Sequence, residues 1–331
     1  MSEYDRLYEA AKELRKQYPA GTRIELISMG ADPQPIEAGA RGTVTGVDDM
    51  AGLMVRWDNG RGLNLDYDHD KYRALTMEEL EAEKEAQEEA LQDRFIDKIN
   101  KEQSENILKA AKLMADAIEQ DRLINVYGGG GHTTLCMGEM FFRAGGLSNI
   151  NPIAENGLTV FNQALKDLEL ERTVNYGSAI MKYYNLQKGD LLLVFHNIGI
   201  NPATIDAVME AKKAGAIIVA ISSSYWQNEM PADHFIRHPN KTNLFDYADV
   251  CIDDYNPVGD AVINVEGFDT PIAPVSNIVD FYIAHMLEIE CVKECQRRGI
   301  KAPCWSSANT PGGDEKNAAY LAKYSPRIKM L

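Results

Sequence analysis

Residues 123–134, LINVYGGGGHTT, decide the fold of this chain. The run Leu123–Tyr127 is short and apolar, which is typical of a strand buried on both faces of a parallel sheet. Four glycines follow, and Thr133 and Thr134 then stand at the start of a predicted helical region that includes Gly138–Arg143. This order of elements places a glycine-rich turn at the carboxyl end of a parallel strand.

The same pattern recurs downstream. Apolar runs at Leu191–Phe195, Ala216–Ile221 and Ala248–Ile252 predict further strands, and Pro202–Lys213 predicts a helix between the first two of them. Strands that alternate with helices in this way form a doubly wound parallel α/β sheet with helices on both faces. We assign residues 106–331 to this domain.

Residues 1–75 differ in character. After a short N-terminal helix, strand-like segments at Thr22–Ile27, Thr43–Val47 and Leu53–Trp57 alternate with turns, and Asn59-Gly60 carries a strong hairpin signal. Short strands at this spacing predict a small all-β barrel. No catalytic constellation stands out in it, so we interpret it as a docking or stabilising module.

An acidic stretch at residues 76–105 joins the two parts. It is rich in glutamate, and Leu91, Phe95 and Ile99 recur at every fourth position, which gives one narrow apolar stripe. We predict a connecting helix whose charges are a solvated face.

Charge and hydropathy exclude several classes of function. The net charge of −16 argues against a nucleic-acid partner, because phosphate backbones require basic counter-charge. No apolar run reaches the roughly 20 residues of a membrane span, and the N-terminus lacks a secretory signal, so we expect a cytoplasmic protein. No cofactor or metal is predicted. Cys291 and Cys295 share a face of a predicted helix, but we interpret all the cysteines as free thiols. They are Cys136, Cys251, Cys291, Cys295 and Cys304.

Open parallel sheets bind ligands beyond the carboxyl ends of their strands, so the loops there are the candidate site. Backbone amides of a glycine-rich loop and of a helix start suit an anion, and hydroxyl groups suit sugar or phosphate oxygens. Asn201 is a predicted N-cap and Pro202 a predicted first helical residue, which aims the free N–H groups of that helix into the crevice. The candidate binding residues are Gly129, Gly130, Gly131, Thr133, Thr134, His196, Asn197, Gly199, Asn201, Ser222, Ser223, Ser224 and Asp260.

Residues from about 106 to the end resemble the sugar isomerase (SIS) domain, in a bacterial subgroup of phosphosugar-binding proteins. The segments that carry the resemblance are FFRAGGLSNINPI (141–153), NPVGDAVINVEG (256–267) and SANTPGGDEKN (307–317). The resemblance implies a five-stranded parallel sheet, a homodimer or homotetramer, and a sugar phosphate as the small-molecule partner. Residues 21–49 and 55–65 likewise resemble a family of small SH3-like bacterial domains of unknown function.

The resemblance also bears on individual residues. Gly129, Gly131, His132 and Thr133 fill the places of the subgroup's first-loop motif. The second loop departs from the SIS pattern, because His196 and Ile198 stand where phosphate-binding serines are usual, while Gly199 and Asn201 remain. A packed histidine at a strand end is an equally good interpretation of His196.

Catalysis would need a base that moves a proton between adjacent sugar carbons. His285, on the predicted helix Ser276–Gln296, matches the catalytic histidine of the SIS sedoheptulose 7-phosphate isomerases. Arg143 occupies the place of their glutamate, so Glu139 or Glu155 would supply the carboxylate, with His132 nearby in the first loop. Aldose–ketose isomerisation is one hypothesis; the others are a non-catalytic sugar-phosphate sensor and a regulatory or adaptor protein that uses the barrel and acidic helix for assembly.

Overall fold

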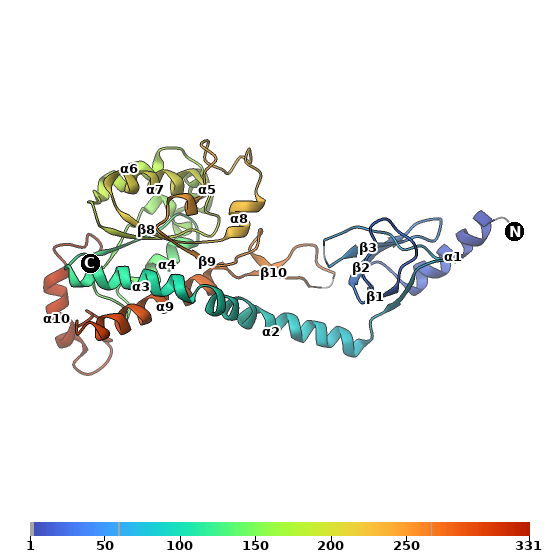
Figure 1. Cartoon of the computed structure of the whole chain (residues 1–331), viewed down its shortest axis with the longest axis horizontal. Coiled ribbons are helices and arrows are strands. Elements are labelled where there is room, and N and C mark those ends of the chain that lie inside the picture. Colours follow the sequence, from blue (N-terminus) through green and yellow to red (C-terminus); the bar gives the residue numbers. More distant parts are fainter. Residues whose placement is uncertain (1–2, 59, 266) are drawn as a thin grey trace. The chain divides into compact units, whose positions relative to one another are not determined.

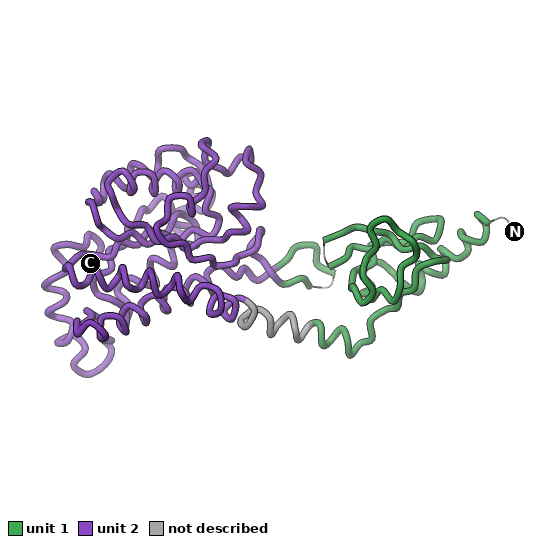
Figure 2. Tube along the Cα trace, in the orientation of Figure 1, with its two compact units in different colours: residues 1–90, 263–271 green, residues 91–262, 272–331 purple. Residues whose placement is uncertain are grey.

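The computed structural model describes residues 3–58, 60–265 and 267–331, and side chains outside residues 84–94. The chain divides into two compact units (Figure 2). Unit 1 comprises residues 1–90 and 263–271, and unit 2 comprises residues 91–262 and 272–331. Asn59 of the predicted hairpin turn and the side chain of Leu91 lie outside the described residues.

Unit 1 is built on a four-stranded antiparallel sheet with the strand order β3-β2-β1-β4. Buried and exposed residues alternate along its strands, as expected when one face of a sheet covers a core. Ile24, Leu26 and Trp57 are among the buried side chains, and Ala11 and Leu14 of the first helix complete this core. The elements are α1 (Glu3–Gln17), β1 (Arg23–Ser28), β2 (Arg41–Val47), β3 (Leu53–Trp57) and β4 (Lys71–Ala74).

The acidic stretch forms the long helix α2 (Met77–Glu102). Two of the three side chains of its predicted apolar stripe, Phe95 and Ile99, are buried in the core of unit 2. The end of this helix is therefore part of the α/β core rather than a fully solvated linker.

Unit 2 contains a five-stranded parallel sheet with the order β6-β5-β7-β8-β9, which confirms the predicted fold class. The central strands are wholly buried, which explains their continuous apolar runs. The strands are β5 (Ile124–Gly128), β6 (Ile150–Pro152), β7 (Leu191–Phe195), β8 (Ile217–Ser222) and β9 (Val250–Asp253), and β10 (Ala261–Ile263) pairs with β11 (Ile272–Pro274) in a small separate sheet.

Helices cover both faces of the parallel sheet (Figure 1). Along β7, Leu191, Leu193 and Phe195 pack into the core beneath α3, α4 and α9, whereas Leu192 and Val194 pack into the core beneath α6 and α7. The helices of this unit are α3 (Ser104–Glu119), α4 (Thr133–Met140), α5 (Ala164–Glu171), α6 (Tyr176–Tyr184), α7 (Pro202–Ala214), α8 (Ser224–Glu229), α9 (Ser276–Arg297) and α10 (Gly313–Tyr324), with 3-10 turns η1 (Asn156–Leu158), η2 (Val160–Asn162) and η3 (Leu244–Tyr247).

The helix predicted around Gly138–Arg143 lies earlier in the chain. The observed helix α4 begins at Thr133, directly after the glycine-rich loop, and ends at Met140, so Arg143 lies outside it. No helix in the described ranges is long and apolar enough to cross a membrane.

Helices α6 and α7 approach so closely that Gly177 of α6 has no room for a side chain. A Cβ atom added there would overlap the carbonyl oxygen of Ala203, which is backbone and cannot move aside. This contact fixes the depth of the buried first turns of α7 against the sheet.

We therefore expect Gly177→Ala to lower the free energy of unfolding by about 2–3 kcal/mol, the usual cost of overpacking a core. Gly138→Ala is the matched control, because an added Cβ at Gly138 meets no atom within 4 Å. Alanine in that helical position should stabilise the chain by about 0.5–1 kcal/mol. Urea unfolding followed by circular dichroism measures both, and an unchanged midpoint for Gly177→Ala would contradict the packing described.

Candidate functional site

The first and second loops meet at the carboxyl edge of the parallel sheet. The β5–β7 ladder ends with Gly128 opposite Phe195, and the N–H of Gly129 donates one further hydrogen bond of 3.0 Å to the Phe195 carbonyl. The structure therefore brings the glycine-rich loop beside the loop that follows β7, as the parallel topology requires.

The glycines of the first loop are needed for packing within the chain itself. A Cβ atom on Gly128 would lie 2.5 Å from the Thr133 carbonyl oxygen. Gly130 has φ +140°, and a Cβ atom there would lie 2.5 Å from the Glu171 side chain. Close packing thus accounts for glycine at these positions, because Glu171 of α5 lies directly against the loop backbone.

The threonine hydroxyls that follow turn back onto this loop. Thr133 donates to the Gly130 carbonyl at 2.6 Å, and Thr134 donates to the Gly131 carbonyl at 2.7 Å. Their oxygens remain acceptors, so the hydroxyls close the first turn of α4 rather than point at a ligand as free donors. His132, just before α4, is exposed.

In the second loop, His196 is a packed histidine. Burial lowers the pKa of His196 to about 4, so the ring is neutral at pH 7. Its Nδ1 accepts a hydrogen bond of 2.8 Å from the N–H of Gly199, which places the ring proton on Nε2. His196 therefore shapes the loop and does not replace a lost serine donor as a cation.

Asn197 points away from the first loop, into a buried pair of acids. Its Nδ2 donates to Asp280 at 2.7 Å and to Asp254 at 3.1 Å. Both carboxyl groups are fully buried, and burial is the main cause that raises the pKa of each. Repulsion from Asp280 further raises the pKa of Asp254, and repulsion from Asp260 further raises that of Asp280.

The carboxyl group of Glu171 lies between the two loops, in the place of the predicted crevice. Glu171 ends α5, and the Nδ2 of Asn201 donates to its Oε2 at 3.1 Å. One turn earlier, Asp167 accepts a hydrogen bond of 3.3 Å from the N–H of Gly131. Burial, and then the neighbouring Asp167, raise the pKa of Glu171 to about 8.

This arrangement corrects the predicted role of the Asn201 side chain, which makes no capping bond to α7 because it is turned toward Glu171. It also adds a residue that the sequence analysis missed. The only signal for Glu171 was an acid pair at i, i+4 in a short helix, and a local pattern does not say which loop such a pair will face.

Several polar groups around this carboxyl have no partner within the described part of the chain. The N–H groups of Ala203 and Thr204, at the buried start of α7, have no acceptor there. The Oδ1 of Asn201 and the hydroxyl of Tyr127, both deeply buried, are also unpartnered. Unpaired buried groups are costly, so this edge of the sheet is built to accept further hydrogen bonds.

The serines at the end of β8, residues 222–224, make hydrogen bonds within the chain itself. Ser222 donates to the His196 carbonyl at 2.7 Å, and Ser223 caps α8 by accepting from the N–H of Tyr225 at 3.1 Å. The backbone N–H of Ser224 donates to Asp253 at 3.1 Å.

Asp260 holds the start of α9. Its Oδ1 accepts hydrogen bonds from the N–H groups of Val275 and Ser276, and its Oδ2 accepts one from the Ser276 hydroxyl at 2.9 Å. The structure therefore gives Asp260 a role as a helix anchor.

The structure brings Glu139 and His285 together. The Nε2 of His285 lies 3.2 Å from Glu139 Oε1, and its Nδ1 lies 3.8 Å from Glu288 Oε2. Arg143 also pairs with Glu139, at 3.0 Å. His132 precedes α4, and no hydrogen bond or ion pair among the described residues joins it to Glu139 or His285.

Glu155 has other partners. It accepts hydrogen bonds of 2.9 Å from the N–H of Gly157 and from the Tyr176 hydroxyl, and so stabilises the turn η1. Across the described ranges, no group of three or more His, Cys, Asp or Glu side chains is arranged to hold a metal ion.

The buried acids predict a stability that falls as the pH rises. Between pH 4.5 and about 8 the folded chain keeps a proton on Glu171 that the unfolded chain has released, so unfolding releases a proton and alkali favours it. One pKa unit corresponds to about 1.4 kcal/mol, so Glu171 alone should cost a few kcal/mol over this range. Urea unfolding from pH 4.5 to 8.5 should show the decline, and Glu171→Gln should make it shallower; an equal slope in both proteins would contradict the assignment.

Comparison with known proteins confirms both resemblances found in the sequence. Residues 90–223 match the SIS domain, and residues 8–75 match a domain of unknown function (DUF4314). The UPF0309 protein of Caldanaerobacter subterraneus subsp. tengcongensis is 34% identical over 239 residues, which are 71% of this chain and 95% of that protein. The UPF0309 protein of Thermoanaerobacter pseudethanolicus is 32% identical over 242 residues, with coverage of 72% and 96%.

Among solved structures, a phosphoheptose isomerase from Neisseria gonorrhoeae is similar with a TM-score of 0.41 and 15% identity, over 67% of this chain and 100% of that one. The identity and coverage of the sequence relatives establish the family. The chain belongs to the UPF0309 family of SIS-domain proteins.

Proposed function

We propose that unit 2 binds a phosphorylated sugar at the carboxyl edge of its sheet, between the glycine-rich loop and the start of α7. The observation that carries this proposal is the Glu171 carboxyl group, because an acidic group of the chain itself already sits between these loops and receives a hydrogen bond from Asn201. The hydrogen-bond donors that surround this carboxyl group are also the donors that a phosphate group needs.

The phosphate would use donors that are unpaired or replaceable. The N–H groups of Ala203 and Thr204 stand at the positive end of the α7 dipole, where anions bind well. Asn201 and the N–H of Gly131 would exchange their present acidic partners for phosphate oxygens. These groups take over the task of the loop serines that this chain lacks.

The raised pKa of Glu171 favours such a ligand. With a pKa of about 8, this group is mostly neutral at pH 7, so it does not repel a phosphate and can donate a hydrogen bond to it. Above pH 8 the same group becomes an anion within the site.

A second candidate function is aldose–ketose isomerisation, favoured by the 3.2 Å contact between His285 and Glu139. The pair would remove a proton from the sugar carbon beside the carbonyl group and return it to the former carbonyl carbon, while a hydroxyl proton moves to the carbonyl oxygen. No oxidant or reductant is consumed. Without this step the same crevice serves a sensor.

We also infer a homo-oligomer, and a cytoplasmic location stays a prediction. Phe161 on η2 is 81% exposed and Leu165 on the neighbouring α5 is 80% exposed, and exposed large apolar side chains favour association. Analytical ultracentrifugation of the chain and of a Leu165→Glu variant would test whether this face is used.

The binding proposal predicts a characteristic pH dependence. We expect sugar phosphates, and not the free sugars, to raise the stability of the chain, by about 2.7 kcal/mol at a hundred times the dissociation constant. Affinity should fall several-fold between pH 7 and 9 as Glu171 ionises, and Glu171→Gln should remove this fall because glutamine stays neutral. Isothermal titration calorimetry with a panel of sugar phosphates provides the measurement.

Glu169→Gln is the matched control, because Glu169 is an exposed acid on the same helix. It should keep the pH dependence of the parent chain. The absence of binding for every sugar phosphate in the panel would refute the proposal.

The catalytic proposal predicts that His285→Ala abolishes interconversion of a bound sugar phosphate while its affinity changes less than threefold. His69→Ala is the control, since His69 is an exposed histidine of unit 1. Solvent deuterium incorporation, followed by NMR, measures the proton transfer directly. Binding without deuterium exchange in the parent chain would assign the protein to the sensor class.

A further inference from the structure

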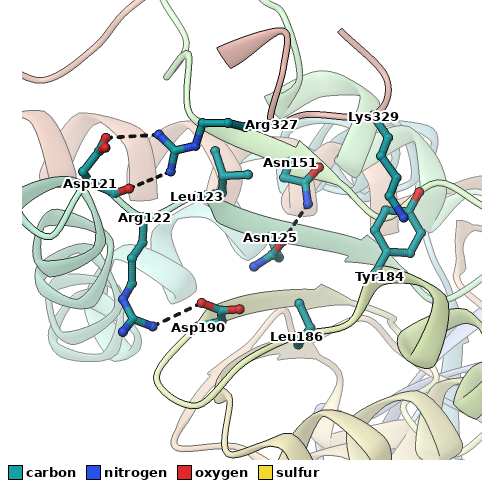
Figure 3. Close-up of a pocket in the computed structure, with 10 residues that line it drawn as sticks. All are labelled: Asp121, Arg122, Leu123, Asn125, Asn151, Tyr184, Leu186, Asp190, Arg327 and Lys329. Carbon is teal, nitrogen blue, oxygen red and sulfur yellow. Dashed lines mark hydrogen bonds and ion pairs between the residues drawn. The ribbon is translucent and has the colours of Figure 1, made fainter. Parts of the chain in front are cut away.

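A pocket of about 280 Å³ opens at the opposite, amino-terminal edge of the parallel sheet (Figure 3). It is formed where the chain enters β5 and β7 and where the segment after α10 crosses that edge. The five residues of β5 separate it from the glycine-rich loop by about 16 Å, so it is not part of the crevice. Its lining residues are Asp121, Arg122, Leu123, Asn125, Asn151, Tyr184, Leu186, Asp190, Arg327 and Lys329.

The floor of the pocket is polar, although it belongs to two buried strands of the parallel sheet, β5 and the outermost strand β6. Asn125 of β5 and Asn151 of β6 are directly paired in the ladder, and both are more than nine-tenths buried. Asn151 donates to the Oδ1 of Asn125 at 2.7 Å (Figure 3). Asn125 in turn donates to the Leu191 carbonyl at 3.1 Å. The chain of bonds leaves the Oδ1 of Asn151 without a donor in the described part of the protein.

Two buried asparagines in the floor of the pocket lower the stability of the fold, so stability does not explain why they are there. Apolar residues are usual at these strand positions, and a buried acceptor without a partner costs free energy. The unpaired amide oxygen of Asn151 lies beneath the pocket surface with almost no accessible area, and the hydroxyl group of a ligand that reached it would supply the missing donor.

The rim of the pocket is positively charged. Arg122 pairs with Asp190 at 3.1 Å, and Asp121 is shared by Arg327 at 3.2 Å and Lys323 at 2.7 Å. Of these, Arg122, Arg327, Asp121 and Asp190 line the pocket, whereas Lys323 lies outside its lining.

A fourth cation, Lys329, has no carboxylate partner among the described residues. Its Nζ lies 3.5 Å from the centre of the Tyr183 ring and 4.6 Å from that of Tyr184, and it donates to the Tyr183 carbonyl at 3.1 Å. The rim thus has more cations than carboxylates, on a chain whose net charge is −16.

We propose that this pocket is a second ligand site, which takes a small anion that carries several hydroxyl groups. The charge of the ligand matches the rim, and a hydroxyl group matches the unpaired oxygen of Asn151. The volume suits a ligand the size of one sugar acid rather than a nucleotide or a peptide. This inference stands apart from the crevice and from the proposed function of that site.

Three small molecules test separately whether the site requires a negative charge and whether it requires hydroxyl groups. Gluconate has both the charge and the hydroxyl groups, sorbitol has hydroxyl groups alone, and inorganic phosphate has charge alone. In calorimetric titrations of the full chain we expect gluconate to bind at least tenfold more tightly than either of the others, and more weakly as salt is added. Equal binding of all three, or no gluconate binding at millimolar concentrations, would overturn the proposal.

Two variants and two controls assign the binding to this pocket. Asn151→Leu, which removes the amide, and Lys329→Gln, which removes the free cation but no core contact, should each weaken gluconate binding about tenfold. Lys316→Gln, at an exposed position of α10, and Asn201→Ala, which removes a donor from the crevice, should leave it unchanged. Unaltered binding in Lys329→Gln, or binding lost in Asn201→Ala, would move the gluconate elsewhere and refute the site.

Discussion

The parallel ladder between β5 and β7 is the constraint on which the rest of this structure depends. Its register ends with Gly128 opposite Phe195, and one more hydrogen bond from Gly129 binds the two following loops to each other. Segments that are far apart in the chain are thereby forced into contact, at a place where backbone must pack against backbone. The glycines satisfy that requirement, and the crevice is what remains between the loops.

Buried acids are the second theme of the structure. Glu171, Glu288, Asp254 and Asp280 all have a pKa raised by burial, although the chain as a whole is strongly acidic. Protonated carboxyl groups fit inside a core because a neutral acid both donates and accepts hydrogen bonds. The chain thus places its acids in contrasting settings, since Arg73 lowers the pKa of Glu79, at the start of α2, to about 2.

The sequence predicted what depends on local pattern. Apolar runs placed β5, β7, β8 and β9 to within two residues, and Pro202 marked the start of α7 correctly. It did not predict the position of the Glu171 carboxyl or the orientation of Asn201, because both depend on how α5 folds over a distant loop. The basic rim around Asn151 was not predicted for the same reason, because its positive charges come from residues 122, 327 and 329, which are far apart in the sequence. The contact between Glu139 and His285 could be suspected from a family pattern, but only the packing of α4 on α9 gives it a distance.

The contact between Gly177 and the Ala203 carbonyl has a consequence for how such a protein diversifies. A position where backbone touches backbone offers no side chain for natural selection to vary, so the amides at the head of α7 stay at one height over evolutionary time. New ligand preferences must then arise in the cover of the crevice rather than in its base. Helix α5 is short and carries exposed side chains on its outer face, so it is the part of this scaffold where substitutions are most easily tolerated.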